Sequence, residues 1–143
     1  MVTWRWRRGA ATSLSQFGDP NVSTDMALCI YDGSGAVQPV VGAVLPSDNL
    51  CPRRQCWAPP VGSWKYTDGE RTPDGVSAVR LQPGSYNDAG ITARLIGANI
   101  GMPALPLTPP VRAQLLNSNG LCWDAVYSMP LMNDGTRFKA RAD

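Results

Sequence analysis

Short segments of this chain alternate between apolar and polar residues, with the two-residue period of a β-strand that has one face in water. The alternation is clear at residues 4–7, 63–67, 91–95 and 111–115. We find no segment that repeats with the 3.6-residue period of a helix. The pattern therefore predicts half-buried strands.

Other strands are expected where the chain is continuously apolar and bounded by turn residues. Residues 26–31 and 36–45 are two such runs, and Asp32-Gly33-Ser34-Gly35 lies between them. An Asp-Gly turn between apolar runs is a strong hairpin signal. Further strands are expected at residues 76–81, 121–127 and 137–141. Residues 102–110 contain four prolines and predict an extended crossing.

Composition agrees with strands and turns. The chain has one Glu and two Lys, which favour helices, but 14 Gly and 13 Pro, which break them. We therefore predict a single all-β domain over residues 1–143. The expected architecture is an antiparallel β-sandwich, jelly-roll or immunoglobulin-like, with about eight or nine short strands.

Charge and hydropathy exclude some functional classes. Lys and Arg number 13 and Asp and Glu 11, so the chain is not a strongly basic polyanion binder, although a local basic patch stays open. No apolar run is long enough for a transmembrane span. Residues 1–8 are basic, and a polar stretch follows instead of the apolar core of a secretory signal. We expect a module cut from a longer secreted protein, or alternatively a mature chain whose signal was removed.

The four cysteines predict disulfide bonds and an oxidising compartment. Cys51 and Cys56 enclose a short polar loop, whereas Cys29 and Cys122 each lie in an apolar, strand-like run. We expect the pairs Cys51–Cys56 and Cys29–Cys122. A four-thiolate zinc site would have two close pairs, and only one is present here. Zinc and buried free thiols remain the alternatives.

The chain contains no His. This excludes Ser-His and Cys-His nucleophiles and most catalytic metal sites. An enzyme would need a carboxylate pair, a Lys base or a Tyr, and none stands out. We therefore predict no catalytic residue and no bound metal or other cofactor. Asp-Gly pairs at Asp32, Asp68, Asp74 and Asp134 raise the alternative of calcium, but turn chemistry explains them.

Aromatic residues near the cysteine loop are the candidate ligand-binding residues. Trp57, Trp64 and Tyr66 are expected to stack on sugar rings or to anchor a protein partner if they are exposed. Packing in the core is the alternative for Trp64, and also for Trp123.

Residues 4–8 (WRWRR) interleave aromatic residues with cations, as nucleic-acid and membrane binders do. We favour an edge strand with its tryptophans inward and its arginines in water. No nucleic-acid partner and no membrane span are therefore predicted.

Several motifs together resemble an uncharacterised module that recurs in secreted proteins of myxobacteria and related bacteria. They are residues 4–12, Phe17-Gly18-Asp19-Pro20, residues 28–32, Cys56-Trp57, Thr72-Pro73-Asp74-Gly75, residues 103–107 and Cys122-Trp123. The resemblance covers nearly the whole chain and ends at residues 138–141. It implies an extracellular, β-rich appendage domain, and it carries over no activity and no catalytic residues.

We therefore expect a non-catalytic extracellular module that works in adhesion, in cell-surface anchoring or in self-assembly into oligomers or fibres. Its partners would be other protein chains, including copies of itself, which its sheet edges would pair with. The alternatives are a carbohydrate-binding module that binds polysaccharide with Trp57, Trp64 and Tyr66, and a hydrolase of unknown type.

Overall fold

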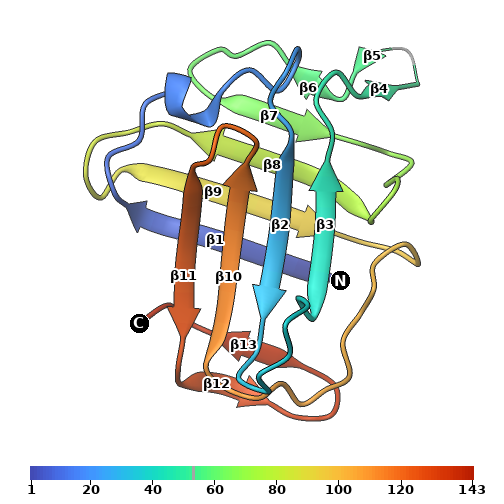
Figure 1. The fold of residues 1–143 in the computed structure, drawn as a ribbon, viewed down its shortest axis with the longest axis vertical. Helices are drawn as coiled ribbons and strands as arrows, with labels where there is room; N and C mark the ends of the chain where they lie inside the picture. Colours follow the sequence, from blue (N-terminus) through green and yellow to red (C-terminus); the bar gives the residue numbers. More distant parts are fainter. Residues whose placement is uncertain (53) are drawn as a thin grey trace.

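A computed structural model describes residues 1–52 and 54–143. Within them the chain forms thirteen strands and one short 3-10 helix, arranged as in Figure 1. The predicted all-β, antiparallel fold is confirmed. The elements are β1 (Val2–Gly9), η1 (Ser15–Phe17), β2 (Met26–Tyr31), β3 (Val41–Leu45), β4 (Leu50–Cys51), β5 (Arg54–Gln55), β6 (Trp57–Ala58), β7 (Trp64–Thr67), β8 (Val76–Gln82), β9 (Ala89–Leu95), β10 (Val111–Asn117), β11 (Cys122–Tyr127), β12 (Pro130–Asn133) and β13 (Phe138–Ala140).

The larger sheet has five strands in the order β1-β9-β8-β7-β6. Strands β6 to β9 form a meander, and β1, from the start of the chain, pairs with β9. The alternation predicted for residues 63–67 is present in β7. Trp64 and Tyr66 are buried, whereas Lys65 and Thr67 are exposed.

The second sheet has four strands in the order β11-β10-β2-β3. The predicted hairpin joins β2 to β3, with Leu28 opposite Ala43, but residues 36–40, expected in the second strand, belong to the connection between the strands. Strand β10 pairs with the other side of β2 and places Leu115 opposite Leu28. All three side chains are buried, so one side of this sheet faces the core.

The two sheets pack face to face around one core. In Figure 1 the four-stranded sheet lies in front, and its strands run across those of the five-stranded sheet behind it. The buried cluster includes Leu28 and Leu115 from the front sheet and Trp57, Tyr66 and Leu81 from the back sheet. Burial of each such side chain is worth about 1.5–3 kcal/mol, so this contact is the main source of stability.

The sheets also meet at one corner, where β1 lies near β11. Trp4 Nε1 donates a hydrogen bond of 2.9 Å to Tyr127 Oη, which joins the edge strands of the two sheets. Burial raises the pKa of Tyr127. The edge-strand prediction for residues 4–8 is confirmed, because Trp4 is buried and Arg5 and Arg7 are exposed.

The described residues form thirteen strands, more than the predicted eight or nine, and nine of them make up the two larger sheets. The short strand β6 in the five-stranded sheet was not predicted. The expected terminal strand at residues 137–141 is present as β13, but the sequence did not predict its partner β12 or the β4–β5 hairpin. Strands β4 and β5 have two residues each, too few to show a period. Strand β12 begins with a proline and buries neither face, so it lacks the alternation that marks the longer strands.

The proline-rich segment at residues 102–110 connects β9 of one sheet to β10 of the other. Its buried Leu107 is held by Asn133, whose side chain accepts a hydrogen bond from Leu107 N (3.0 Å) and donates one to Leu107 O (2.7 Å). The Asp32 carboxylate accepts a hydrogen bond of 3.0 Å from Thr108 N, and Gly33 N donates to Thr108 O. Asp32 therefore ties the β2–β3 turn to the crossing.

We expect the Asp32→Asn variant to lose less stability on acidification than the wild type. The Ser34 hydroxyl and then Thr108 N–H hold the pKa of Asp32 below its ordinary value. The ionised Asp32 carboxylate therefore stabilises the fold fully above about pH 4, which is the pKa of Asp in the unfolded chain. This stabilisation is lost as the pH falls through the lower pKa that Asp32 has in the folded protein.

Urea unfolding at pH 7 and at pH 3 measures the effect, with Glu70→Gln as the control. Glu70 is exposed, and among the described residues its carboxylate accepts no hydrogen bond. An acid-induced loss of stability equal in all three proteins would contradict the role given to Asp32.

Candidate interaction surface

The three aromatic residues predicted to bind a ligand are buried. The exposed fraction is 0% for Trp57, 5% for Trp64 and 1% for Tyr66. A sugar ring cannot stack on them while the domain stays folded, so their prediction as exposed binding residues is wrong. The alternative of core packing is confirmed for Trp64, and also for Trp123.

These rings form a cluster at one end of the five-stranded sheet. The Trp57 ring lies 5.1 Å from that of Tyr66 and 6.4 Å from that of Trp64, both edge to face. Asn49 Nδ2 donates to Tyr66 Oη at 3.1 Å, and burial raises the pKa of Tyr66. Strand β6 pairs with β7, and this pairing turns the Trp57 indole inward.

The predicted Cys51–Cys56 disulfide is present. It closes the β4–β5 hairpin, and Cys56 is buried. Cys56 O accepts a hydrogen bond of 2.9 Å from Thr67 N at the end of β7. The disulfide therefore holds the loop over the aromatic cluster. Arg53, inside this loop, lies outside the described residues.

The predicted Cys29–Cys122 disulfide is wrong, because both cysteines are free thiols. Both side chains lie on the outer side of the four-stranded sheet, but β10 lies between their strands. Two strand spacings amount to about 9.6 Å, beyond the 4.4–6.8 Å between the Cα atoms of a disulfide. The apolar runs around the two cysteines correctly predicted strands but contained no information on which strands are neighbours.

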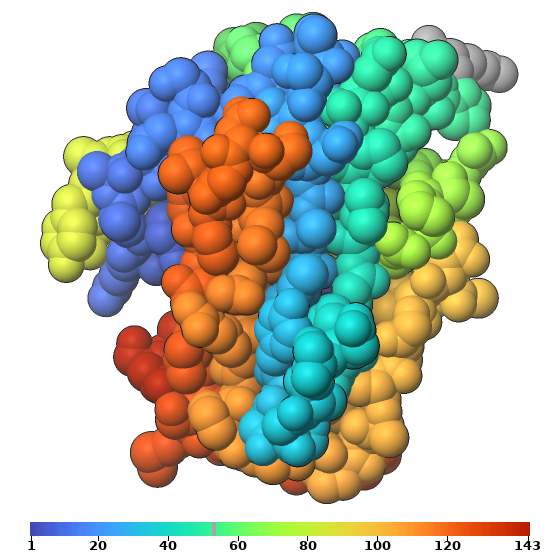
Figure 2. All heavy atoms as spheres, in the orientation of Figure 1, coloured from blue at the N-terminus to red at the C-terminus, as the bar shows by residue number. Residues whose placement is uncertain are grey.

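The outer side of the four-stranded sheet faces away from the core. Its outward side chains are, strand by strand, Cys122, Asp124 and Val126 on β11, Arg112, Gln114 and Leu116 on β10, Ala27, Cys29 and Tyr31 on β2, and Gly42 and Val44 on β3. Most are apolar, and we call this surface the apolar face. In Figure 2 it is turned toward the viewer, and the four strands lie side by side across it.

One row of the apolar face is apolar from edge to edge. The strand registers place Cys122 beside Leu116, Leu116 beside Ala27, and Ala27 beside Val44. Val44 is 47% exposed. Antiparallel sheets commonly carry polar residues on the side in water, so an apolar row at this position is typical of a contact surface.

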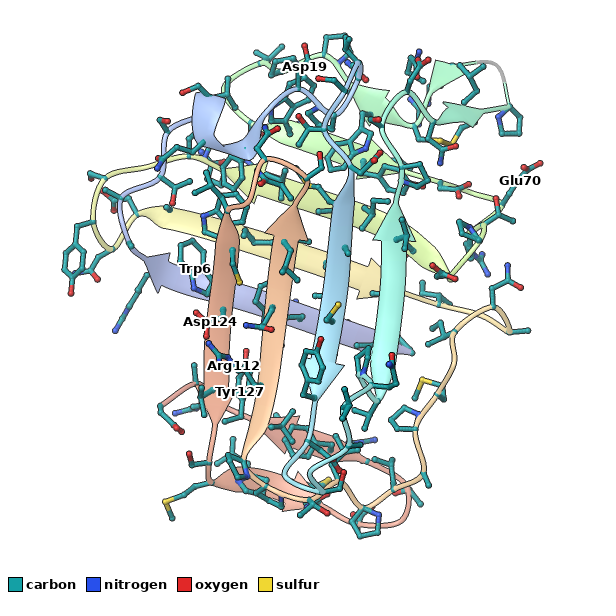
Figure 3. The ribbon with its side chains drawn as sticks, in the orientation of Figure 1. Trp6, Asp19, Glu70, Arg112, Asp124 and Tyr127 are labelled. Atoms are coloured by element: carbon teal, nitrogen blue, oxygen red, sulfur yellow. A yellow bond between two sulfur atoms is a disulfide. The ribbon has the colours of Figure 1, made fainter. Side chains whose placement is uncertain are left out.

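A single ion pair lies on the apolar face. The Arg112 guanidinium binds Asp124 through Nη2 (2.6 Å) and Nε (2.8 Å), and Figure 3 shows the two side chains together. Both are partly exposed, and an exposed pair stabilises a fold by about 1 kcal/mol at most. The ion pair therefore contributes little to stability, but it places a cation and an anion next to each other on a surface where most side chains are apolar.

The chain itself occupies parts of both edges of this sheet. Asp74 Oδ2 accepts a hydrogen bond of 2.8 Å from Val44 N on β3. Asp143 N donates to Val126 O on β11, and the Asp143 carboxylate binds Ser128. These contacts block strand addition at Val44 and Val126, so the face is more open to a partner than the edges are.

Two shallow hollows on the surface of the described residues bring polar side chains together. A shallow hollow of about 340 Å³ between β1 and β11 is lined by Arg5, Arg7, Asp124 and Asp143 among others, and another of about 540 Å³ lies beside Thr12. Among the described residues, no group of three or more Cys, Asp or Glu is placed to hold a metal ion. In the same part of the chain, no helix has the length and apolar character needed to cross a membrane.

Comparison of the chain with protein-family models, with curated proteins and with solved structures finds no match. The resemblance to a module of secreted bacterial proteins therefore stays a prediction. The outer surfaces of the two larger sheets are therefore the features of this chain that bear on its function.

We expect two of the four cysteines to react with an alkylating reagent in unfolded, non-reduced protein. Cys29 and Cys122 supply these thiols, and reduction of Cys51–Cys56 exposes two more. Intact mass measures the count. If no cysteine reacts before reduction, Cys29 and Cys122 are disulfide-bonded after all. If four cysteines react before reduction, the Cys51–Cys56 disulfide is absent.

We expect Trp57→Ala to destabilise the domain by about 3–5 kcal/mol, as aromatic-to-alanine changes in a core do. Tyr86→Ala is the control, because Tyr86 is 73% exposed and should change stability by less than about 0.5 kcal/mol. Equilibrium urea unfolding gives both values. A Trp57→Ala variant as stable as Tyr86→Ala would show that the indole is not part of the core.

Proposed function

We propose that this domain is a non-catalytic extracellular interaction module that associates with copies of itself through the apolar face. The observation that carries the proposal is the apolar row across all four strands of that face. The absence of His from the sequence supports a non-catalytic role. The Cys51–Cys56 disulfide supports an oxidising, extracellular location.

The charges on the apolar face favour a second copy as the partner. Arg112 on β10 and Asp124 on the edge strand β11 are diagonal neighbours across the two strands. A two-fold axis in the plane of the contact, halfway between them, brings each Arg112 opposite the Asp124 of the other copy. The same operation lays apolar residues on apolar residues, so the face is complementary to itself.

The size of the face predicts a weak association. Four strands about 4.8 Å apart and seven residues about 3.4 Å apart cover about 450 Å² on each copy. The total, about 900 Å², is below the range of stable interfaces, about 1,200–2,000 Å². We therefore expect reversible, concentration-dependent dimers instead of an obligate dimer.

The fold type is also part of this proposal. Two antiparallel sheets around one core support a β-sandwich. The crossing of the strands in Figure 1 favours orthogonal packing over the aligned packing of an immunoglobulin-like domain. The jelly-roll type stays a prediction.

We expect sedimentation velocity to show dimers that increase with protein concentration in the wild type and disappear in Val44→Arg. A cation at this position has no partner in the apolar row and must lose its water on association. Val61→Arg is the control, because Val61 is 92% exposed and lies in the β6–β7 loop, away from the face.

A charge-exchange experiment tests the two-fold arrangement itself. Arg112→Glu gives a face with two acids, and Asp124→Lys gives a face with two cations, so each variant alone should stay monomeric. An equimolar mixture should recover the dimer, since opposite faces then meet. Wild-type protein that is monomeric at every concentration, or variants that associate as the wild type does, would refute the proposal.

A further inference from the structure

The outer side of the five-stranded sheet carries a cluster of cations. The exposed, outward side chains include Arg5 and Arg7 on β1, Arg94 on β9, Arg80 on β8 and Lys65 on β7. All five strands of this sheet lie in the described residues, and none of them contains Asp or Glu. We call this surface the basic face. It lies on the side of the molecule opposite the apolar face and points away from the viewer in Figure 1.

Strand register creates the basic face. The pairing places Arg5 beside Thr92, Thr92 beside Arg80, and Arg80 beside Lys65, in one row across four strands. Arg94 lies in the next row, opposite Thr3. These cations are far apart in the sequence, and the total charge of the chain is nearly neutral. Neither feature of the sequence indicates that the cations gather on one surface.

The cations of the basic face have no acidic partners. Within residues 1–52 and 54–143 the only ion pair is Arg112–Asp124, on the other sheet. Arg80 donates to the neutral Gln82, at 2.8 Å. At the β1 edge, Asp124 and Asp143 line the same hollow as Arg5 and Arg7, so negative charge lies at the rim and not on the face.

The unpaired cations oppose folding in the free protein. Arg80 and Lys65 are direct cross-strand neighbours, and like charges in that position destabilise a sheet. A bound polyanion would remove this repulsion and form charge-assisted hydrogen bonds with the guanidinium groups. A surface of this kind is typical of a polyanion-binding site.

We propose that the basic face binds an acidic, extracellular polysaccharide. A sugar polymer that carries a carboxylate or sulfate on its rings has its charges separated by the length of about one sugar ring or more. On the sheet, Arg80 is one strand from Lys65, about 5 Å, and two strands from Arg5, about 10 Å, whereas a nucleic-acid strand carries one phosphate for about every 3.4 Å along its helix axis. The threonine hydroxyls between the cations provide donors and acceptors for sugar hydroxyls.

Other anionic partners fit the basic face less well. Trp4, Trp57, Trp64 and Tyr66 are buried, and Trp6 is half-buried and packs against the core from the inward side of β1. No ring on these strands therefore lies on the basic face, where a nucleic-acid base would stack. The remaining outward residues are small or polar, and none would insert into a lipid bilayer. They are Thr3, Ala58, Thr67, Ala78, Gln82, Gly90 and Thr92.

Titration calorimetry against alginate, dextran sulfate and unmodified dextran tests the proposal. We expect binding to the two acidic polymers that weakens as salt is added, and no binding to neutral dextran. In the Lys65→Gln/Arg80→Gln double variant, binding should weaken about tenfold or more, the effect of losing one strong charge-assisted contact. Arg137→Gln/Arg141→Gln removes the same charge outside the basic face and should bind as the wild type does.

Further measurements keep the test decisive. The thermal midpoint of each variant reports whether it is folded, and Arg5→Gln/Arg94→Gln replaces the first pair if that pair unfolds. The proposal would be overturned if the control variant Arg137→Gln/Arg141→Gln lost as much affinity as the test variant. It would also be overturned if the domain bound single-stranded DNA or phosphatidylglycerol vesicles more tightly than either acidic polysaccharide. Val44→Arg should bind the acidic polymers normally, so this result is independent of self-association.

Discussion

Each long strand of this domain buries one side against the opposite sheet, and the free energy of that burial holds the two sheets together. Leu28 and Leu115 supply the apolar surface from the front, and Trp57 and Tyr66 supply it from the back. Because side chains on a strand alternate, a strand that gives one side to the core must give the other to solvent. The side chains that form the core therefore fix which side chains of the same strands are exposed on the outer surface.

The sequence predicted the features that depend on local pattern. Alternation at residues 63–67 and 111–115 correctly predicted the strands β7 and β10, and the Asp32-Gly33 turn predicted the hairpin between β2 and β3. The short loop between Cys51 and Cys56 was enough to predict their disulfide. In each case neighbouring residues along the chain contain the information.

Features that depend on register and strand order could not be predicted in this way. Cys29 and Cys122 were expected to pair, but β10 lies between them. Trp57 has no long periodic segment around it, so its burial follows only from the pairing of β6 with β7. The basic face is the clearest example, because its five cations come from four strands that lie far apart in the sequence.

The two sheets share one core between them, so the apolar face and the basic face lie on opposite outer sides of the domain. A pair of domains joined through their apolar faces therefore turns its two basic faces outward, on opposite sides of the pair. Such a pair is divalent, but it cannot place both basic faces on one straight stretch of polymer. It would instead bridge two separate strands, and chains held at many such points form a cross-linked gel. The thickness of two domains would then set the distance between the strands of that network.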